Sequence, residues 1–184
     1  MQLKKVLAIS GSTRANSINH SLINAIKLLT EYELEIKTFA GIAELPQFNP
    51  DDDNETVAPV VVDFRQQLDE AAGVLICTPE YAHGVPGALK NAIDWTISSS
   101  QFPHKPTMLI TASTGGEYGH RALMETLKAI EAKNIDELQM IIPFAKTKIS
   151  MHNEITDETT LAATRELIAR FITTIRGNAA PSVD

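Results

Sequence analysis

Unbroken apolar runs alternate along the chain with segments whose apolar residues recur every three or four positions. Short apolar runs are typical of strands buried on both faces of a parallel sheet. The runs of this kind are Lys5–Ser10, Gly73–Thr78, Thr107–Ala112 and Leu138–Ile142, and the alternating stretch Leu34–Thr38 predicts a more exposed strand. Helical spacing predicts helices over Asn19–Leu29, Val60–Ala72, Gly87–Ser98, Arg121–Lys133 and Asp157–Arg176, the last of them capped by Thr156 or Asp157.

Strands and helices alternate five times, which predicts an α/β fold with one parallel sheet and helices on both faces. Five strands suit the flavodoxin-like order 2-1-3-4-5. No internal repeat or linker divides residues 1–184, so we expect a single domain with frayed residues 177–184. The connection from Ala40 to Pro59 is unusually long, and connections of about 20 residues are often functional. Its run Asp51–Asp53 predicts a solvated loop, with a metal site as the weaker alternative.

Composition and charge narrow the class of partner. The chain has 184 residues and a net charge of −7, which disfavours nucleic acid and anionic membrane surfaces. The N-terminal apolar run Val6–Ile9 is too short for a signal peptide or a membrane span. Cys77 is the one cysteine, so a disulfide within the chain is impossible. We therefore expect a soluble, cytoplasmic protein.

The segment Ser10–Asn19 follows the first predicted strand and is rich in hydroxyl and amide groups. The next helix presents its positive end there, and the forked donors of Arg14 match a phosphate. The alternative is a polar turn in which Ser17 merely caps the helix. The segment lacks the glycines of Walker and dinucleotide-binding loops, so a terminal monophosphate suits it better than a pyrophosphate.

Two further loops belong to the same edge of the predicted sheet. Thr78–Gly87 is stiffened by prolines, and Gly84 and Gly87 allow unusual backbone angles. It could border a flat heterocycle, or it could be a structured loop with Tyr81 at a subunit contact. Ser113–Gly119 contains paired glycines that would let a planar ligand lie against the backbone, although a flexible turn has the same signature.

Residues for direct catalysis are not evident. The five histidines lack metal-ligand spacing, no nucleophile elbow is present, and Cys77 falls in a predicted buried strand. We assign no catalytic residue and no metal ligand, and we expect a bound cofactor to carry the chemistry.

Together the loops resemble the NADPH-dependent FMN reductase family, whose members include soluble quinone, azo-dye and chromate reductases. The resembling segments are Ile9–Asn19, Glu44–Asp51, Thr78–Trp95 and Pro106–Gly116. The resemblance implies FMN as cofactor and NADPH or NADH as electron donor. It also implies a small-molecule acceptor (a quinone, an azo compound, free flavin or a metal oxyanion) and a homodimer or homotetramer, for which the helix around Leu89–Ile97 has apolar residues to spare.

The same resemblance implies the residues that bind the cofactor. The phosphate site would comprise Ser12, Thr13, Arg14, Ser17 and Asn19; the ring would be bordered by Pro79, Glu80, Tyr81, Ala82 and His83 on one side and by Ser113, Thr114, Gly115 and Gly116 on the other. Two other readings stay open: a flavodoxin-type electron carrier without enzymatic activity, and a regulatory or scaffold domain that has kept the fold.

Overall fold

In the computed structural model, which describes residues 3–178, a parallel five-stranded sheet has the order β2-β1-β3-β4-β5. The predicted strand order is therefore confirmed. The strands are β1 (Lys4–Ser10), β2 (Leu34–Thr38), β3 (Gly73–Thr78), β4 (Thr107–Ala112) and β5 (Gln139–Ile142). The helices are α1 (Ile18–Leu29), α2 (Pro59–Glu70), α3 (Gly87–Asp94), α4 (Glu117–Ala129) and α5 (Glu158–Gly177).

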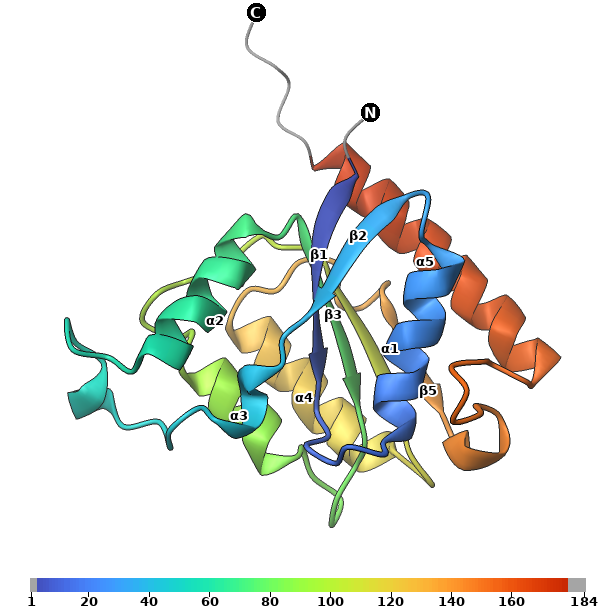
Figure 1. Ribbon diagram of the computed structural model, residues 1–184, viewed down its shortest axis with the longest axis horizontal. Helices are drawn as coiled ribbons and strands as arrows, with labels where there is room; N and C mark the ends of the chain where they lie inside the picture. The colour runs from blue at the N-terminus through green and yellow to red at the C-terminus, as the bar shows by residue number, and fades with distance from the viewer. Residues whose placement is uncertain (1–2, 179–184) are drawn as a thin grey trace, which may run out of the picture.

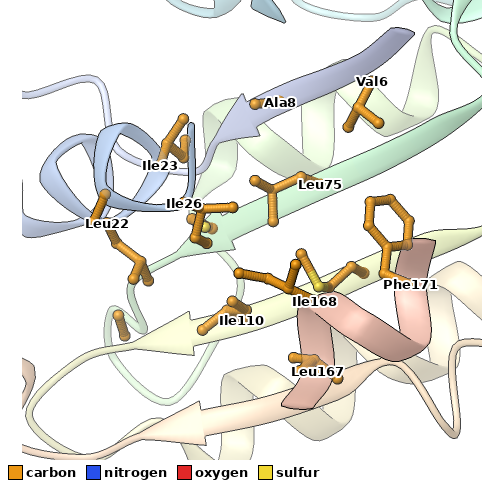
Figure 2. Packing of buried hydrophobic residues seen from close by; sticks show 14 of the residues in the cluster. Val6, Ala8, Leu22, Ile23, Ile26, Leu75, Ile110, Leu167, Ile168 and Phe171 are labelled. Carbon is orange, nitrogen blue, oxygen red and sulfur yellow. The ribbon is translucent and has the colours of Figure 1, made fainter. Parts of the chain in front are cut away.

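The helices form a layer on each face of the sheet (Figure 1). α1 and α5 pack on one face, where Leu22, Ile26 and Phe171 bury their side chains against Val6 and Leu75 (Figure 2). α2, α3 and α4 cover the other face, against a second apolar cluster. Every residue of β3 and β4 is buried, as expected for central strands covered on both faces.

Two helices differ from the prediction by four residues at an end, and the other three differ by no more than two. α4 ends at Ala129 rather than Lys133. α4 begins at Glu117 rather than Arg121, so Glu117–Gly119 is helical and not part of a loop. The Glu80 carboxylate accepts a hydrogen bond from the Gly119 N–H at 2.5 Å, and this long-range contact satisfies a free donor in the first turn. α3 ends at Asp94 rather than Ser98, and turns follow it.

The apolar residues of α3 are not spare. Leu89, Ile93 and Trp95 are all 0–1% exposed within the chain. The expectation that this helix offers an apolar face to another subunit is wrong, because its apolar residues pack into the core beneath α2 and α4. Ile97, beyond the end of the helix, is 57% exposed.

The final helix begins as predicted, because the Asp157 side chain accepts a hydrogen bond from the Thr160 N–H at 2.8 Å. It extends to Gly177, and positions 179–184 of the expected frayed end lie outside the described residues. No helix within residues 3–178 combines the length and the apolar character needed to cross a membrane.

The long connection between β2 and α2 is fastened to the helices beside it. The Asn91 side chain accepts a hydrogen bond from the Phe48 N–H at 2.7 Å and donates one to the Pro46 carbonyl at 2.9 Å. Asp53 forms an ion pair with Arg65 at 2.9 Å. The prediction of a solvated acidic run is thus wrong for Asp53, although Asp51 and Asp52 are exposed.

Candidate functional site

A cleft of about 780 Å³ opens at the carboxyl ends of β1, β3 and β4. Its volume falls in the range that small-molecule and cofactor sites occupy. Nine predicted site residues line it: Ser12, Arg14, Ser17, Asn19, Pro79, Glu80, Tyr81, Ser113 and Thr114. The cleft therefore brings together residues from all three predicted loops, which are far apart in the sequence.

The other five predicted residues do not line the cleft. Thr13 faces a neighbouring hollow of about 500 Å³ between α1 and the end of β2. Ala82 and His83 form the tip of the loop after β3. Gly115 lies near Glu80: a Cβ added at Gly115 would be 4.0 Å from Glu80 Oε1. Gly116 is the N-cap of α4. These positions can support the cleft without being part of its surface.

The loop after β1 is pinned at its start. The Gly11 N–H donates to the Cys77 carbonyl at 2.8 Å, which brings the two strand ends together. A Cβ at position 11 would lie 2.1 Å from Thr78 Oγ1, so this close approach requires glycine. The Ser12 N–H donates to Ser10 Oγ at 3.2 Å. These bonds give the loop a defined starting conformation.

Beyond Ser12 the same loop keeps its donors unused. Among residues 3–178, no acceptor takes the backbone N–H groups of residues 13 and 15–18. Ser17 caps α1 by accepting from the Asn19 N–H at 3.2 Å. Arg14 is exposed and forms no ion pair within the described part of the chain. Free N–H groups, the positive end of α1 and an unpaired guanidinium together favour an anion.

Asn19 contributes an unpaired acceptor. Its side chain is 3% exposed, and its Nδ2 donates to the Ala112 carbonyl at 3.2 Å. Among residues 3–178, its Oδ1 is one of three buried side-chain polar atoms without a partner, and it is the one whose residue lines the cleft. A buried unpaired oxygen costs about 1–3 kcal/mol, so a ligand that donates a hydroxyl to it would recover that free energy.

The loop after β3 is a tight two-residue turn. Tyr81 and Gly84 exchange backbone hydrogen bonds of 3.2 and 2.9 Å. The left-handed residues are Ala82 (φ 49°) and His83 (φ 59°), so the expectation that Gly84 and Gly87 supply the unusual angles is wrong. A turn of this geometry needs positive φ at its two central positions. The His83 ring stacks on Tyr118 of α4, with 4.4 Å between ring centroids.

Glu80 joins the loops after β3 and β4. Its N–H donates to Ser113 Oγ at 3.3 Å, while its carboxylate is held by the Gly119 N–H. Its polar groups therefore position two walls of the cleft relative to each other.

A fourth wall comes from the segment after β5, Phe144–Met151, which we call the cleft wall. It contributes Phe144–Thr147 and Ile149–Met151 to the lining. The Phe144 and Ala145 N–H groups donate to the Thr114 and Ser113 carbonyls at 3.1 and 3.0 Å. Sequence reasoning missed this segment, together with Asn16, Ile18 and Ala112. The available signal was its position after the fifth strand, which ends at the same edge of the sheet.

Two titratable groups near the site are structural. Cys77 is fully buried in β3, which confirms its predicted place in a buried strand, and burial raises the pKa of its thiol. His120 bridges Thr111 and Gln139 with ring contacts of 2.8 Å, and burial lowers its pKa. Within the described chain, no three His, Cys, Asp or Glu side chains are placed to hold a metal ion.

Comparison with known proteins agrees with this geometry. A family model described as NADPH-dependent FMN reductase matches residues 4–147. An NAD(P)H-dependent FMN reductase from Pseudomonas aeruginosa is 32% identical, with 89% of each chain covered. A quinone reductase from Escherichia coli is 29% identical over 85% of this chain and 87% of its own.

The fold also matches a solved structure. The flavoenzyme NAD(P)H:(acceptor) oxidoreductase FerB from Paracoccus denitrificans superposes with a TM-score of 0.79. The match covers 95% of this chain and 98% of that one at 24% identity. The expected oxidoreductase class, the cofactor FMN and a reduced nicotinamide as electron donor are confirmed by the family match. This chain belongs to the NADPH-dependent FMN reductase family.

Proposed function

We propose that the cleft binds FMN and that the chain uses NAD(P)H to reduce a small-molecule acceptor: a quinone, an azo compound, free flavin or a metal oxyanion. The observation that carries the proposal is the set of unused backbone N–H donors at residues 13 and 15–18, beside the unpaired Asn19 oxygen. A phosphomonoester would take the donors, and a hydroxyl on the sugar chain next to it would donate to Asn19.

The atoms that lack a hydrogen-bond partner indicate which part of FMN each residue of the first loop would contact. The Arg14 guanidinium and the N–H groups around Ser17 would hold the phosphate. Thr13 would contribute through its free backbone N–H, since Thr13 lines the neighbouring hollow and not the cleft. Asn19 would orient the sugar chain rather than the phosphate, because its Nδ2 already donates to Ala112.

The remaining walls suit a flat ring. Pro79 and Tyr81 border the cleft on one side and Thr114 on another, with Gly115 and Gly116 behind. Ala82 and His83, at the tip of the turn after β3, would support the side formed by Pro79 and Tyr81. The hydrogen bond between Glu80 and Ser113 would hold the loops after β3 and β4 in a fixed relative position. Positioning and exclusion of water are then the contributions of the protein, and no residue acts as an obligatory acid or base.

When bound, FMN would supply two-electron chemistry: it would accept a hydride from the nicotinamide and pass two electrons to the acceptor, and a quinone that also takes up two protons would become a hydroquinone.

We also propose that the chain forms a homodimer or homotetramer. The mass in solution, measured by light scattering, tests this; a monomer would remove the claim.

The test of the main proposal is an anaerobic absorbance experiment on the purified protein with added FMN. We expect FMN to bind with one site per chain and its absorbance to bleach rapidly on addition of NADPH. Bound flavin that NADPH does not bleach would instead indicate an electron carrier. Failure to take up FMN would indicate a regulatory or scaffold domain and would reject the proposal.

A further inference from the structure

The cleft wall exposes apolar surface toward the cleft. Phe144 is 63% exposed and Met151 is 51% exposed, and Tyr81, on the loop after β3, is also 51% exposed. All three line the same cavity. Exposed apolar area costs about 25 cal/mol per Å² relative to burial, and large apolar side chains that gather at one cavity mark a ligand surface.

Phe144 is also held in an unfavourable backbone conformation. Its φ and ψ are 53° and 38°, in the left-handed region that a bulky side chain rarely adopts. Hydrogen bonds from its N–H to Thr114 and from the Thr147 N–H to its carbonyl, at 3.1 and 2.9 Å, keep it there. Burial of the side chain does little to offset this strain, since Phe144 is largely exposed. Strain of this kind collects at ligand-binding positions.

The charge of the cleft is opposite to that of the chain. The charged side chains that line it are Arg14, Lys146 and Glu80. The Glu80 carboxylate is held by the Gly119 N–H, and neither cation forms an ion pair with any residue between 3 and 178. A chain with a net charge of −7 thus presents two free cations in one cavity. The proposed phosphate site uses Arg14, which leaves Lys146 without an assigned partner.

We propose that the residues of the cleft wall that line the cavity, Phe144–Thr147 and Ile149–Met151, form the acceptor subsite, and that it selects planar aromatic acceptors that carry an anionic substituent. The exposed face of Phe144 packs against the acceptor ring, and Lys146, two residues further along, pairs with the anionic group. The inference rests on the proposed function and names the substrate class of that same site. The acceptor takes two electrons from NAD(P)H through the bound flavin, together with two protons, and a quinone becomes a hydroquinone.

Two quinones that differ in one anionic group separate the roles of the two residues: 1,4-naphthoquinone and its 2-sulfonate. In the FMN-loaded protein we expect Lys146→Gln to raise the KM for the sulfonate by about five- to tenfold at low salt, an effect that added salt reduces. The KM for the neutral quinone should change less than about twofold, since no charge pairs with it. Lys148→Gln is the matched control, because Lys148 lies in the same segment but does not line the cleft. It should leave both values unchanged.

The aromatic contact is tested by Phe144→Ala. We expect the KM for both quinones to rise by about tenfold, the loss of one stacked ring, with a smaller change in the KM for NADPH. Phe144→Tyr should restore the wild-type values. Tyr32→Ala, a change at an 86% exposed residue in the turn between α1 and β2, is the control for removal of a surface aromatic, because Tyr32 does not line the cleft.

The outcomes distinguish this inference from the proposed function. Equal responses to the two lysine substitutions, or a sulfonate preference that survives Lys146→Gln, would overturn the charge selection. An unchanged quinone KM in Phe144→Ala, or an equal rise in the KM for NADPH, would overturn the acceptor subsite while FMN still bound and bleached. Loss of FMN binding in the wild type would reject the proposed function instead.

Discussion

Two polar connections leave the same edge of the sheet and use their hydrogen-bonding groups in opposite ways. We call the connection after β2, residues 40–58, the strap. Its polar groups are paired within the protein: the Phe48 N–H with Asn91, the Pro46 carbonyl with the Trp95 indole, and Asp53 with Arg65. The loop after β1 leaves the backbone N–H groups of residues 13 and 15–18 unpaired within the described chain, beside an unpaired Asn19 oxygen. Both look polar and loop-like in the sequence.

The difference shows which property identifies a binding loop. Length favoured the strap as the functional segment, and length misleads here because a long connection can be tied down by side chains from helices that it crosses. Unpaired buried or convergent polar groups are a better guide, since folding alone gives no reason to leave them unsatisfied. The predictions below test this contrast by removing one side chain at a time.

The largest expected effect is on the strap. Asn91→Leu keeps the side-chain volume but leaves the Phe48 N–H without its acceptor. It also removes one of the two donors to the Pro46 carbonyl, which keeps its hydrogen bond from the Trp95 indole. We expect the free energy of unfolding to fall by about 3 kcal/mol, measured by urea denaturation, with the Kd for FMN unchanged in the folded protein. Lys90→Met, at an exposed position on the same helix, should cost less than about 0.5 kcal/mol. A large loss of FMN affinity in Asn91→Leu would contradict the view that the strap serves the stability of the fold and the loop after β1 serves FMN binding.

The converse change is Arg14→Ala. We expect it to weaken FMN binding by about 1.5–3 kcal/mol, through the loss of charge-assisted hydrogen bonds to the phosphate. The urea midpoint of the FMN-free protein should not move, since Arg14 is exposed and unpaired. Fluorescence titration with FMN measures the first quantity. Arg170→Ala, at an exposed position on α5, is the control, and equal affinities in the two variants would contradict the phosphate assignment.

A smaller effect is expected for Asp53→Asn, with a defined pH dependence. The Ser98 hydroxyl and the Arg65 guanidinium hold the pKa of Asp53 below its usual value. Its carboxylate therefore stabilises the fold above the unfolded-state pKa, about 3.9, and this contribution is lost as the pH falls through the folded-state pKa.

We expect Asp53→Asn to lower the free energy of unfolding by about 1–2 kcal/mol near neutral pH. The difference from wild type should begin to shrink below about pH 4 and should be lost as the pH falls through the lowered folded-state pKa, where the wild-type carboxyl becomes protonated in the folded protein as well. Urea denaturation at a series of pH values gives this difference directly. A difference that stays constant down to acid pH would show that the charge of Asp53 does not fasten the strap.

The smallest expected effect is a gain in stability at the cleft wall. Phe144→Gly removes the left-handed strain, and we expect the free energy of unfolding to rise by about 0.5–1 kcal/mol after the entropy cost of glycine. Thermal denaturation of the FMN-free protein measures it. A clear loss of stability would show that the Phe144 ring contributes packing, and that its position is not maintained at the expense of the fold.

The sequence predicted the sheet well because each buried parallel strand is recognised from a short run of neighbouring apolar residues. β2, β3 and β4 have the predicted bounds, and β1 and β5 differ by one residue. The strand order is the flavodoxin-like one expected for five strands that alternate with helices. The loop after β1 was also predictable, since Ser17, Asn19 and Arg14 lie within one turn of the same helix start.

The features that depend on contacts between distant residues could not be predicted. The start of α4 depends on the Glu80 carboxylate, which reaches Gly119 from another loop. The strap is fastened by Asn91 and Arg65, which the sequence pattern marks only as helical. The cleft wall has no motif of its own and joins the site through hydrogen bonds to Ser113 and Thr114.

The amino-acid sequence by itself determined the α/β class, the order of the strands, and which loops meet at one edge of the sheet. Only the tertiary structure decided which of the polar groups on those loops are already paired and which are free. The physical reason is that strand burial and helix periodicity are properties of neighbouring residues, whereas the satisfaction of a hydrogen-bonding group depends on what the folded chain brings within about 3 Å of it.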